Sequence, residues 1–444
     1  MSELRRSVAF AVVGVLALAA PELDPRQTVT AAVLAASPLL FVAGYALLLG
    51  EDGPFFELFA RSEEFESGQL FGLGSFALAA AAIVAFAVGT PLSIVAAVTA
   101  IFTLTGGRVG AAIAIERGRG TFASMLGFLV AALAWGAVGA VAADFLAEGT
   151  AFGAFAPTQV GFLAAAAAVT AALLRDMFGG HDAPLILVSV ALVVWLCADL
   201  DPTVPPVRFV VGVAATTLLG YVAYGLGTAS IAGMLTGVLL ALFAVVLGGY
   251  GWFALLVTFF GLGALASKFR YDDKAERGIA EANDGARGSG NVLANSAVAL
   301  AAVVGYAATM GVDATLAPAF RLAFAGSVAT ALADTFSSEF GGLFDNPRLI
   351  TTLGRVEPGT DGAVTWQGEL FGLLGASLIA GLAALGFGLD APTTGLVVLG
   401  GVVGMTTDSL LGATLEGGRV GNQTVNFLAT FSGGVTAGVL FMLL

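Results

Sequence analysis

The feature that most constrains this chain is the recurrence, along its whole length, of apolar runs of 15 to 25 residues. The runs consist mainly of Ala, Leu, Val, Gly and Phe, and about 20 such residues form a helix that crosses the hydrocarbon core of a bilayer. A transmembrane β-barrel would show short alternating segments instead. We therefore predict an all-α fold, a polytopic bundle of about 15 transmembrane helices. The expected spans are residues 7–21, 28–49, 71–89, 91–105, 122–146, 158–174, 185–199, 207–226, 229–248, 251–267, 291–311, 317–340, 368–388, 394–411 and 424–443. The least certain break is at Gly248–Gly251, where a kink would lower the count by one.

The composition agrees with a membrane protein. The chain is 58% hydrophobic and 11% charged, whereas a soluble domain carries about 25% charged residues. The net charge is −13, and only Lys268 and Lys274 are lysines. An acidic, lysine-poor chain rich in Ala and Gly resembles proteins of salt-loving archaea and argues against nucleic acid as a partner. The single cysteine, Cys197, excludes an intramolecular disulfide and a cysteine-based metal cluster.

The distribution of basic residues predicts the orientation. With the N-terminus in the cytoplasm, 15 of the 18 basic residues fall in cytoplasmic segments and three (Arg26, Arg208, Arg321) on the other side. Cytoplasmic loops of membrane proteins carry an excess of Arg and Lys. The longer loops, 50–70, 106–121, 268–290, 341–367 and 412–423, then all lie inside as well. We expect a multi-pass protein of the plasma membrane with its N-terminus in the cytoplasm.

Polar residues are concentrated in the C-terminal half. Residues 1–225 are mostly plain apolar spans, and we assign them to an N-terminal membrane domain of unknown role. Residues 226–444 hold nearly all the dense polar clusters and form the expected functional domain. The string Gly106–Gly110 recurs as Gly417–Gly421, which is weak evidence of duplication in a glycine-rich chain.

The first polar cluster follows the span 251–267. It includes Lys268, Arg270 and Lys274, and it runs on to Gly288, Gly290 and Asn291. Lys supplies a point charge and Arg a two-pronged fork, both of which suit phosphate groups at the membrane surface. The alternative is an anchor that fixes the topology or contacts anionic lipid.

The second cluster, Thr330–Gly342, carries Asp334 and Glu339 at the inner end of a span. A carboxylate at membrane depth is costly and is by default a candidate functional group. Two carboxylates with hydroxyl groups nearby are oxygen ligands suited to Mg²⁺ that carries nucleotide phosphates. The alternative is a helix end whose polar side chains bond to neighbouring helices.

The third cluster, Asn346–Gly362, is too polar and too rich in turn residues to span a membrane. Arg348 and Arg355 flank hydroxyl groups, including Thr351, in a pattern that suits a phosphate or nucleotide loop. The alternative is a plain connection between spans, although loops of this length are often functional.

The fourth cluster runs from Gly404 past Asp408 to Asn422 and Asn426 at the start of the last span. A transporter could use such glycine-rich helix ends to bind a coupling ion. A metal–nucleotide complex could occupy the same place, and structural packing of Asn and Thr is the third alternative.

Taken in order, the strings SKFRYDDKAERG with GNVLAN, ADTFSSEFG, PRLITTLGRVEPGTDGAVT, and TDSLLGATLEG with NQTVNFL resemble the phytyl-phosphate kinase-like family of integral membrane proteins. The resemblance covers roughly residues 230–444. Distant relatives of that family, dolichol kinase and phosphatidate cytidylyltransferase, are membrane enzymes that use CTP. This sequence departs from the family's usual Asn-Asp before the last helix, where it has Asn422-Gln423.

The resemblance implies a Mg²⁺-dependent kinase that converts a polyprenyl monophosphate to the diphosphate at the cytoplasmic face, with CTP or ATP as co-substrate. Asp334, Glu339 and Asp408 would be the catalytic and metal-binding residues. The candidate nucleotide- and phosphate-binding residues are Lys268, Arg270, Lys274, Asn291, Asn295, Arg348, Thr351, Arg355, Asn422 and Asn426. The expected partners are the lipid bilayer and an isoprenoid phosphate, and the oligomeric state is left open.

Three other functions stay open at this point. A secondary transporter would use Asp334 and Asp408 as ion ligands and would need no nucleotide. A cytidylyltransferase would form a CDP-activated lipid and release diphosphate. A non-catalytic scaffold would leave the clustering of carboxylates at one face without a role.

Overall fold

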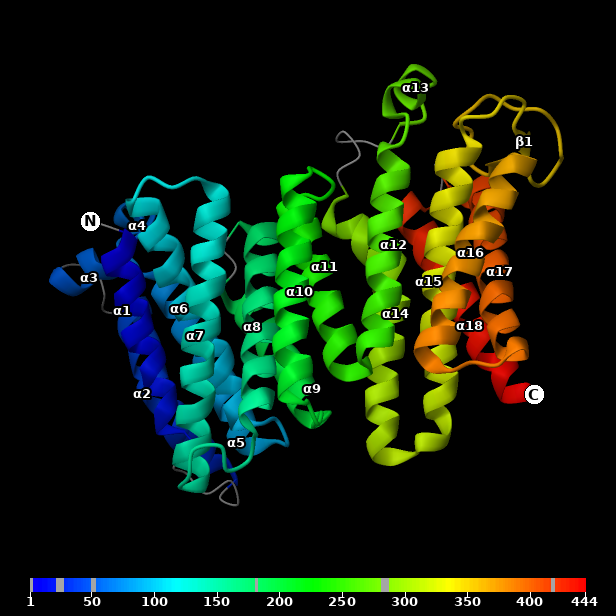
Figure 1. The fold of residues 1–444 in the computed structure, drawn as a ribbon. Coiled ribbons are helices and arrows are strands. Elements are labelled where there is room, and N and C mark those ends of the chain that lie inside the picture. Colours follow the sequence, from blue (N-terminus) through cyan, green and yellow to red (C-terminus); the bar gives the residue numbers. More distant parts are fainter. Residues whose placement is uncertain (1–2, 21–27, 49–52, 180–182, 281–286, 417–419) are drawn as a thin grey trace. The chain divides into compact units, whose positions relative to one another are not determined.

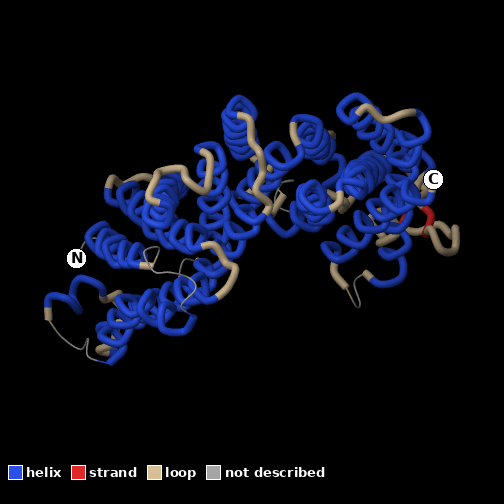
Figure 2. Tube along the Cα trace, turned by 90° about the horizontal axis from the view of Figure 1, so that it is seen from below, coloured by secondary structure: helices blue, strands red, loops and turns tan. Residues whose placement is uncertain are grey.

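The computed structural model describes residues 3–20, 28–48, 53–179, 183–280, 287–416 and 420–444. Helices make up most of these residues, and Figure 2 shows many of the helices end-on. The named strands in this part of the chain are β1 (Arg348–Leu349) and β2 (Ala363–Val364), an antiparallel pair in which Arg348 faces Val364. The predicted all-α polytopic bundle is therefore confirmed. Arg419, the arginine of the second glycine-rich string, lies outside the described residues, and so does His181, the one histidine of the sequence.

The chain forms two compact units, Met1–Pro205 and Pro206–Leu444. The sequence-based boundary after residue 225 was drawn from the density of polar clusters, whereas the boundary between the units reflects packing. Helix α10 (Pro206–Gly225) packs against α11 (Ile231–Phe243) and therefore belongs to the C-terminal unit.

The N-terminal unit is built around α6 (Ile94–Glu116), which packs against helices on several sides. Its glycines permit close approach: a Cβ atom at Gly110 would lie 2.0 Å from the carbonyl oxygen of Gly127. The other elements of this unit are α1 (Glu3–Val15), η1 (Leu16–Ala19), α2 (Thr28–Leu48), α3 (Pro54–Phe59), α4 (Glu64–Ser67), α5 (Phe71–Gly89), α7 (Thr121–Glu148), α8 (Pro157–Phe178) and α9 (Ala183–Asp199).

The C-terminal unit continues from α10 and α11 with helices that run alternately in opposite directions (Figure 1). Its further elements are η2 (Ala244–Gly248), α12 (Tyr250–Lys268), α13 (Tyr271–Glu276), α14 (Ser289–Val312), η4 (Ala314–Leu316), α15 (Ala317–Gly341), α16 (Trp366–Phe387), α17 (Ala391–Leu415) and α18 (Asn422–Leu443). Helices α12, α15 and α17 end where α13 and the β1–β2 hairpin lie, and α14, α16 and α18 begin there. We call this the α13 end of the unit.

Thirteen helices in the described part of the chain are long and apolar enough to cross a membrane. Two expected spans remain, and both coincide with shorter helices. The span 7–21 corresponds to α1 followed by η1, and the span 185–199 corresponds to α9. The uncertain break is present: η2 is a π-helical turn, and Gly249 has a φ of 101°, a conformation that glycine adopts without a steric penalty. The side of the membrane on which the N-terminus lies stays a prediction.

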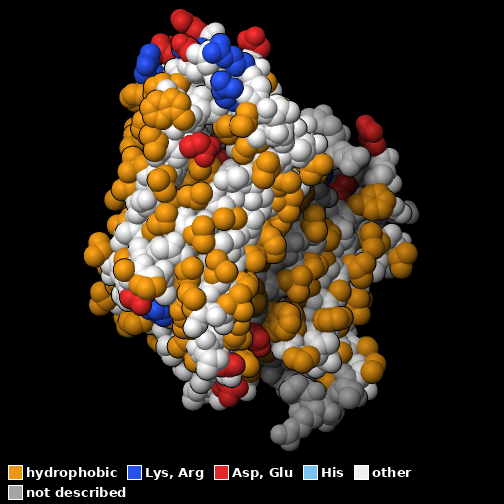
Figure 3. Space-filling model, turned by 90° about the vertical axis from the view of Figure 1, so that its right-hand side faces the viewer, with side chains coloured by type: hydrophobic (Ala, Val, Ile, Leu, Met, Phe, Trp, Pro, Cys, Tyr) orange, Lys and Arg blue, Asp and Glu red, His pale blue; other side chains and the backbone are white. Residues whose placement is uncertain are grey.

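The surface of the C-terminal unit suits lipid. Large apolar side chains on α16 point outward, among them Leu385, which is 85% exposed, and Trp366, which is 70% exposed. Figure 3 shows one face of this unit, with most charged side chains gathered at one end, a few at the opposite end, and hydrophobic side chains spread over the face between. An exposed apolar surface of this extent marks contact with a membrane.

Candidate functional site

Two aspartates meet where α15 and α17 cross most closely. A Cβ atom at Gly404 would lie 2.1 Å from Thr330 Oγ1, so the absence of a side chain lets the two helices touch. Thr330 Oγ1 also donates a hydrogen bond of 3.2 Å to the carbonyl oxygen of Gly400. Asp334 and Asp408 follow Thr330 and Gly404 by one helical turn and therefore share the faces that are in contact. Their carboxyl groups lie within hydrogen-bonding reach of each other.

The Asp334–Asp408 pair is electrostatically unusual. Two carboxylates this close repel each other unless a proton or a cation lies between them. Both side chains are half-buried, and no N–H or O–H donor among the described residues reaches the buried Asp408 Oδ1. The guanidinium of Arg287 and the carboxylate of Glu416 act electrostatically on Asp334. The pair can therefore accept a proton, a metal ion or a ligand's hydrogen-bond donors.

Glu416 lies at the C-terminal end of α17 under the loop that carries the β1–β2 hairpin. Gly362 of this loop has a φ of 73°, and a Cβ atom there would lie 2.5 Å from Ser409 O, so the loop rests directly on α17. Partial burial, with the nearby charge of Asp361, raises the pKa of Glu416 above that of an ordinary glutamate. Glu416 thus adds a third acid near the Asp334–Asp408 pair, and the loop brings Asp361 close to Glu416.

Arg287 is held in place by its backbone and by an aromatic ring. Its N–H donates to Thr228 O at 3.0 Å, and its carbonyl oxygen accepts from Ser230 N–H at 3.1 Å. The guanidinium carbon lies 5.6 Å from the centre of the Phe259 ring, a cation–π contact. A Cβ atom at Gly263 would lie 3.1 Å from a guanidinium nitrogen, so this glycine leaves room for the side chain.

The first turns of α14 and α18 lie side by side at the same end of the unit. A Cβ atom at Gly290 would lie 2.5 Å from Gln423 Nε2. Asn291 Oδ1 is buried and has no hydrogen-bond partner among the described residues, and Asn295 Nδ2 donates to Asn291 O at 3.0 Å. The residue that departs from the family pattern, Gln423, therefore packs beside a candidate phosphate-binding residue.

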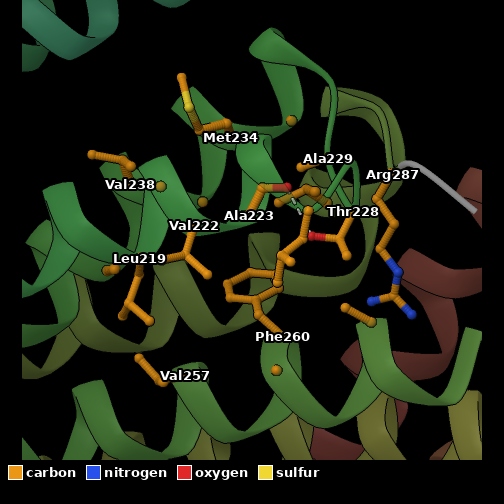
Figure 4. Close-up of a pocket in the computed structure, with 18 of the residues that line it drawn as sticks. Leu219, Val222, Ala223, Thr228, Ala229, Met234, Val238, Val257, Phe260 and Arg287 are labelled. Carbon is orange, nitrogen blue, oxygen red and sulfur yellow. Dashed lines mark hydrogen bonds between the residues drawn. The ribbon is translucent and has the colours of Figure 1, made fainter. Parts of the chain in front are cut away.

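An apolar cavity of about 320 Å³ opens between α10, α11 and α12 (Figure 4). Figure 4 shows Arg287 at one edge and Leu219, Val222 and Phe260 across from it. The volume is at the lower end of the roughly 300–1,000 Å³ that is typical of small-molecule sites. Arg287 lines the cavity, and its charge also acts on Asp334. One side chain therefore takes part in both the cavity and the surroundings of the aspartate pair.

Glu339 and Lys274 occupy a different place. Lys274 Nζ donates to Glu339 Oε2 at 2.6 Å, to Ser267 O at 2.7 Å and to Ala266 O at 3.0 Å. An ammonium group has three N–H donors, and all three are used. Both side chains are buried, and Glu339 is not among the charges that act on Asp334. The structure thus separates Glu339 from the other two candidate metal ligands and gives Lys274 a structural partner instead of a phosphate.

The remaining predicted residues lie at the α13 end. Lys268, Arg348, Thr351, Arg355 and Asn422 are exposed there. Arg270 is also exposed and forms an ion pair with Asp273, and Arg348 Nη1 donates to Leu353 O at 2.6 Å. Asn295 is buried and Asn426 half-buried. These side chains border the end of the unit that contains the pair, but no described contact joins them to it.

Two residues near the pair had not been selected from the sequence. Arg287 was one basic residue among several in a charged loop, and Glu416 follows Asp408 by eight residues, about two helical turns. The spacing of Glu416 was a usable signal because residues seven or eight apart lie on nearly the same face of a helix. Arg287 gave no comparable signal, since its position depends on the bridge to Ala229.

The donor set determines which metal would fit. Among the described residues, no group of three or more His, Cys, Asp and Glu side chains could hold a metal ion. Mg²⁺ needs no such cage in nucleotide enzymes, because one or two carboxylates and the substrate phosphates bind it. Asp334 and Asp408, with the unpartnered Asp408 Oδ1, fit that arrangement.

The fold and this site define a polytopic membrane protein with a carboxylate pair at one end of its helices. The family described as "Integral membrane protein DUF92" matches residues 214–434, nearly all of the C-terminal unit. The chain belongs to this family of integral membrane proteins. The N-terminal unit lies outside the match.

Relatives of this chain occur in archaea, cyanobacteria and plants. The uncharacterized membrane protein MJ0933 of Methanocaldococcus jannaschii is 38% identical over 195 residues, which are 44% of this chain and 77% of that protein. Protein VTE6 of Arabidopsis thaliana, a chloroplastic protein, is 29% identical over 194 residues, 43% of this chain and 58% of VTE6. Protein PGR of the same plant is 31% identical over 235 residues, 48% of this chain and 81% of PGR. No solved structure matches the chain significantly.

Proposed function

We propose that this chain is a transferase, a membrane-embedded kinase of the polyprenyl-phosphate type, which converts a polyprenyl monophosphate to the diphosphate with CTP, or ATP in its place, as donor. The observation that supports this most is the Asp334–Asp408 pair, which lies beside Arg287 and near an apolar cavity. Phosphoryl transfer depends mainly on alignment and charge neutralisation, for which such a pair and a fixed guanidinium are suited. The motifs that resemble phytyl-phosphate kinase-like proteins lie in the same unit.

Each group has a role in the proposed reaction. Asp334 and Asp408 would hold Mg²⁺, which supplies positive charge that offsets the nucleotide phosphates when bound. Arg287 would orient the acceptor phosphate, and the apolar cavity would hold the first part of the prenyl chain. Lys268, Arg348 and Arg355, exposed at the α13 end, would contact the nucleotide.

No general base is needed in this scheme. A phosphate monoester is already anionic near neutral pH. One of its oxygens attacks the γ-phosphorus of CTP, the bond from that phosphorus to the β–γ bridging oxygen breaks, and CDP leaves. The reaction would take place at the cytoplasmic side of the plasma membrane.

The test is product analysis with labelled CTP, Mg²⁺ and a phosphorylated C20 isoprenoid, on purified full-length protein in detergent at high salt. Prenyl diphosphate and CDP are the expected products, and ATP is tried in parallel. A CDP-lipid with release of diphosphate would identify a cytidylyltransferase instead. If no nucleotide is consumed, the proposal fails, and flux across vesicles becomes the test of a transporter.

The variant Asp334→Asn links the activity to the pair. It keeps the size of the side chain but removes a metal ligand, so turnover should fall by at least about 10²-fold, the scale of losing one electrostatic contact in a transition state. Asp272→Asn, which changes an exposed aspartate at the same end, is the matched control and should retain full activity. Equal activity of both variants would remove the pair from the mechanism.

A further inference from the structure

The N-terminal unit, which lies outside the family match, contains a second site of distinct chemistry. A pocket of about 320 Å³ is lined by four arginines from four separate parts of the chain: Arg6 of α1, Arg61 between α3 and α4, Arg108 of α6 and Arg175 of α8. The hydroxyl-bearing residues Ser7 and Ser62 line it too. From this convergence we infer that the N-terminal unit binds a ligand that carries a phosphate group.

The protein neutralises the four guanidinium groups only in part. Among the described residues, Arg61, Arg108 and Arg175 have no carboxylate within ion-pair distance. Arg6 has Glu3 at 4.0 Å, and Glu3 and Glu63 are the acids in the lining. Glu3 also acts electrostatically on Arg108 and Arg175, and Asp176, which does not line the pocket, acts on Arg175 as well. The lining therefore carries an excess of positive charge in a chain whose net charge is −13.

The carboxylate of Glu64, which is close in sequence to Arg61, is bonded to main-chain N–H groups. Glu64 is buried, and its carboxylate accepts the main-chain N–H of Arg61 at 2.8 Å and the main-chain N–H of Gly72. Because these bonds fix the carboxylate on the backbone, it shapes the turn that carries Arg61 instead of pairing with the guanidinium. The turn thereby presents Arg61 to the pocket.

Aromatic contacts position two of the arginines. The Arg108 guanidinium carbon lies 5.4 Å from the centre of the Phe10 ring, and that of Arg175 lies 5.0 Å from the Phe128 ring. Arg61, Arg175 and Arg6 all act electrostatically on Arg108. Like charges held this close repel one another, and a bound anion relieves the repulsion.

The lining favours phosphate over a single carboxylate. Each guanidinium offers five N–H donors in a planar fork that matches phosphate oxygens. Four forks and two hydroxyl groups exceed what one carboxylate can accept, whereas a phosphate monoester has three terminal oxygens and about two negative charges. The phosphate can belong to a lipid head group or to a soluble compound.

The test uses full-length protein purified in detergent without phosphate buffer and two probes. Inorganic phosphate is titrated by calorimetry, and phosphatidic acid in mixed micelles is followed by native mass spectrometry. Arg108→Gln and Arg61→Gln should each weaken binding by at least about tenfold, the scale of one lost hydrogen bond to a charged group. Arg119→Gln, an exposed arginine just after α6, is the matched control and should bind as the unchanged protein does.

The outcomes separate the sources of the phosphate. Binding of phosphatidic acid alone, sensitive to both pocket variants, would assign a lipid head group, and binding of inorganic phosphate would assign a soluble ligand. If neither probe binds, or if Arg119→Gln weakens binding as much as the pocket variants do, the inference is overturned. The arginines would then serve only as an anchor that fixes the topology. If Arg108→Gln does not fold, Arg61→Gln tests the same pocket from a loop, and Arg108→Lys should retain part of the binding because it keeps the charge.

Discussion

At the scale of single residues, the sequence identified the charged groups but not their partners. Asp334 and Glu339 were placed in one metal site, yet five residues of α-helix turn through about 500°, which leaves their side chains about 140° apart. Asp334 accordingly meets Asp408, whereas Glu339 meets Lys274. The helical period could have separated the two acids, but it could not supply Lys274, since that pairing depends on how α13 folds back on α12.

The Lys274–Glu339 pair gives a prediction about stability. Lys274→Met alone should destabilise the protein by about 3–5 kcal/mol, because it leaves a buried carboxylate without its cation. The double variant with Glu339→Gln should lose much less than the sum of the two single changes. Unfolding midpoints in detergent, arranged as a double-mutant cycle, measure this coupling. Strictly additive effects would show that the pair is not formed.

The apolar cavity gives a prediction about substrate length. Gly237 lines the cavity, and a Cβ atom there meets nothing within 4 Å, so Gly237→Phe should fill the cavity without disturbing the helices. For a C20 prenyl phosphate, kcat/KM should fall by at least about tenfold, as expected when a pocket no longer admits part of a chain. For a C5 prenyl phosphate it should change little. If both substrates respond equally, the prenyl chain lies elsewhere.

At the scale of helices, hydropathy predicts which segments are helical, because a chain in lipid must satisfy its backbone hydrogen bonds within each helix. It predicts helix ends less well: the span expected at 91–105 continues to Glu116 in α6, so most of the expected loop 106–121 is helical. All 15 expected spans correspond to helices. Which faces meet was not predictable, since Gly and Ala occur on every side of α15, α16 and α17. Only the structure shows that α15 and α17 pack with Thr330 facing Gly404.

That packing gives a prediction at the level of the helix pair. Gly404→Ala should destabilise the unit by about 1–3 kcal/mol through overpacking, because its Cβ would overlap Thr330 Oγ1. It should also lower turnover, since Asp334 and Asp408 lie one turn further along. Gly395→Ala in the same helix is the matched control: nothing lies within 4 Å of its Cβ, and stability should stay equal or rise by about 0.5–1 kcal/mol. Similar thermal unfolding of the two variants would contradict the close contact.

At the scale of the molecule, each of the two units carries its own cluster of charged side chains. The cluster of the C-terminal unit consists of carboxylates and suits a cation, and that of the N-terminal unit consists of arginines and suits an anion. The family match and the aspartate pair belong to the C-terminal unit, and the four-arginine pocket belongs to the N-terminal one. Sequence patterns located the first cluster because its residues fall in dense polar strings. They did not locate the second, since Arg6, Arg61, Arg108 and Arg175 come from four segments far apart in the sequence, and none of these segments is a dense polar string.

The orientation in the membrane can be tested from the two ends of the C-terminal unit. In the C-terminal unit, Thr352 lies at the α13 end, and Thr315 lies at the opposite end, between α14 and α15. The excess of Arg and Lys at the α13 end predicts that it faces the cytoplasm. Because Cys197 is the only cysteine, a Cys197→Ala background permits single-cysteine labelling with a membrane-impermeant maleimide. In intact cells Thr315→Cys should react and Thr352→Cys should react only after the membrane is opened. The reverse pattern would invert the orientation and place the aspartate pair on the outer side, away from cytoplasmic nucleotide, so the kinase proposal would fall with it.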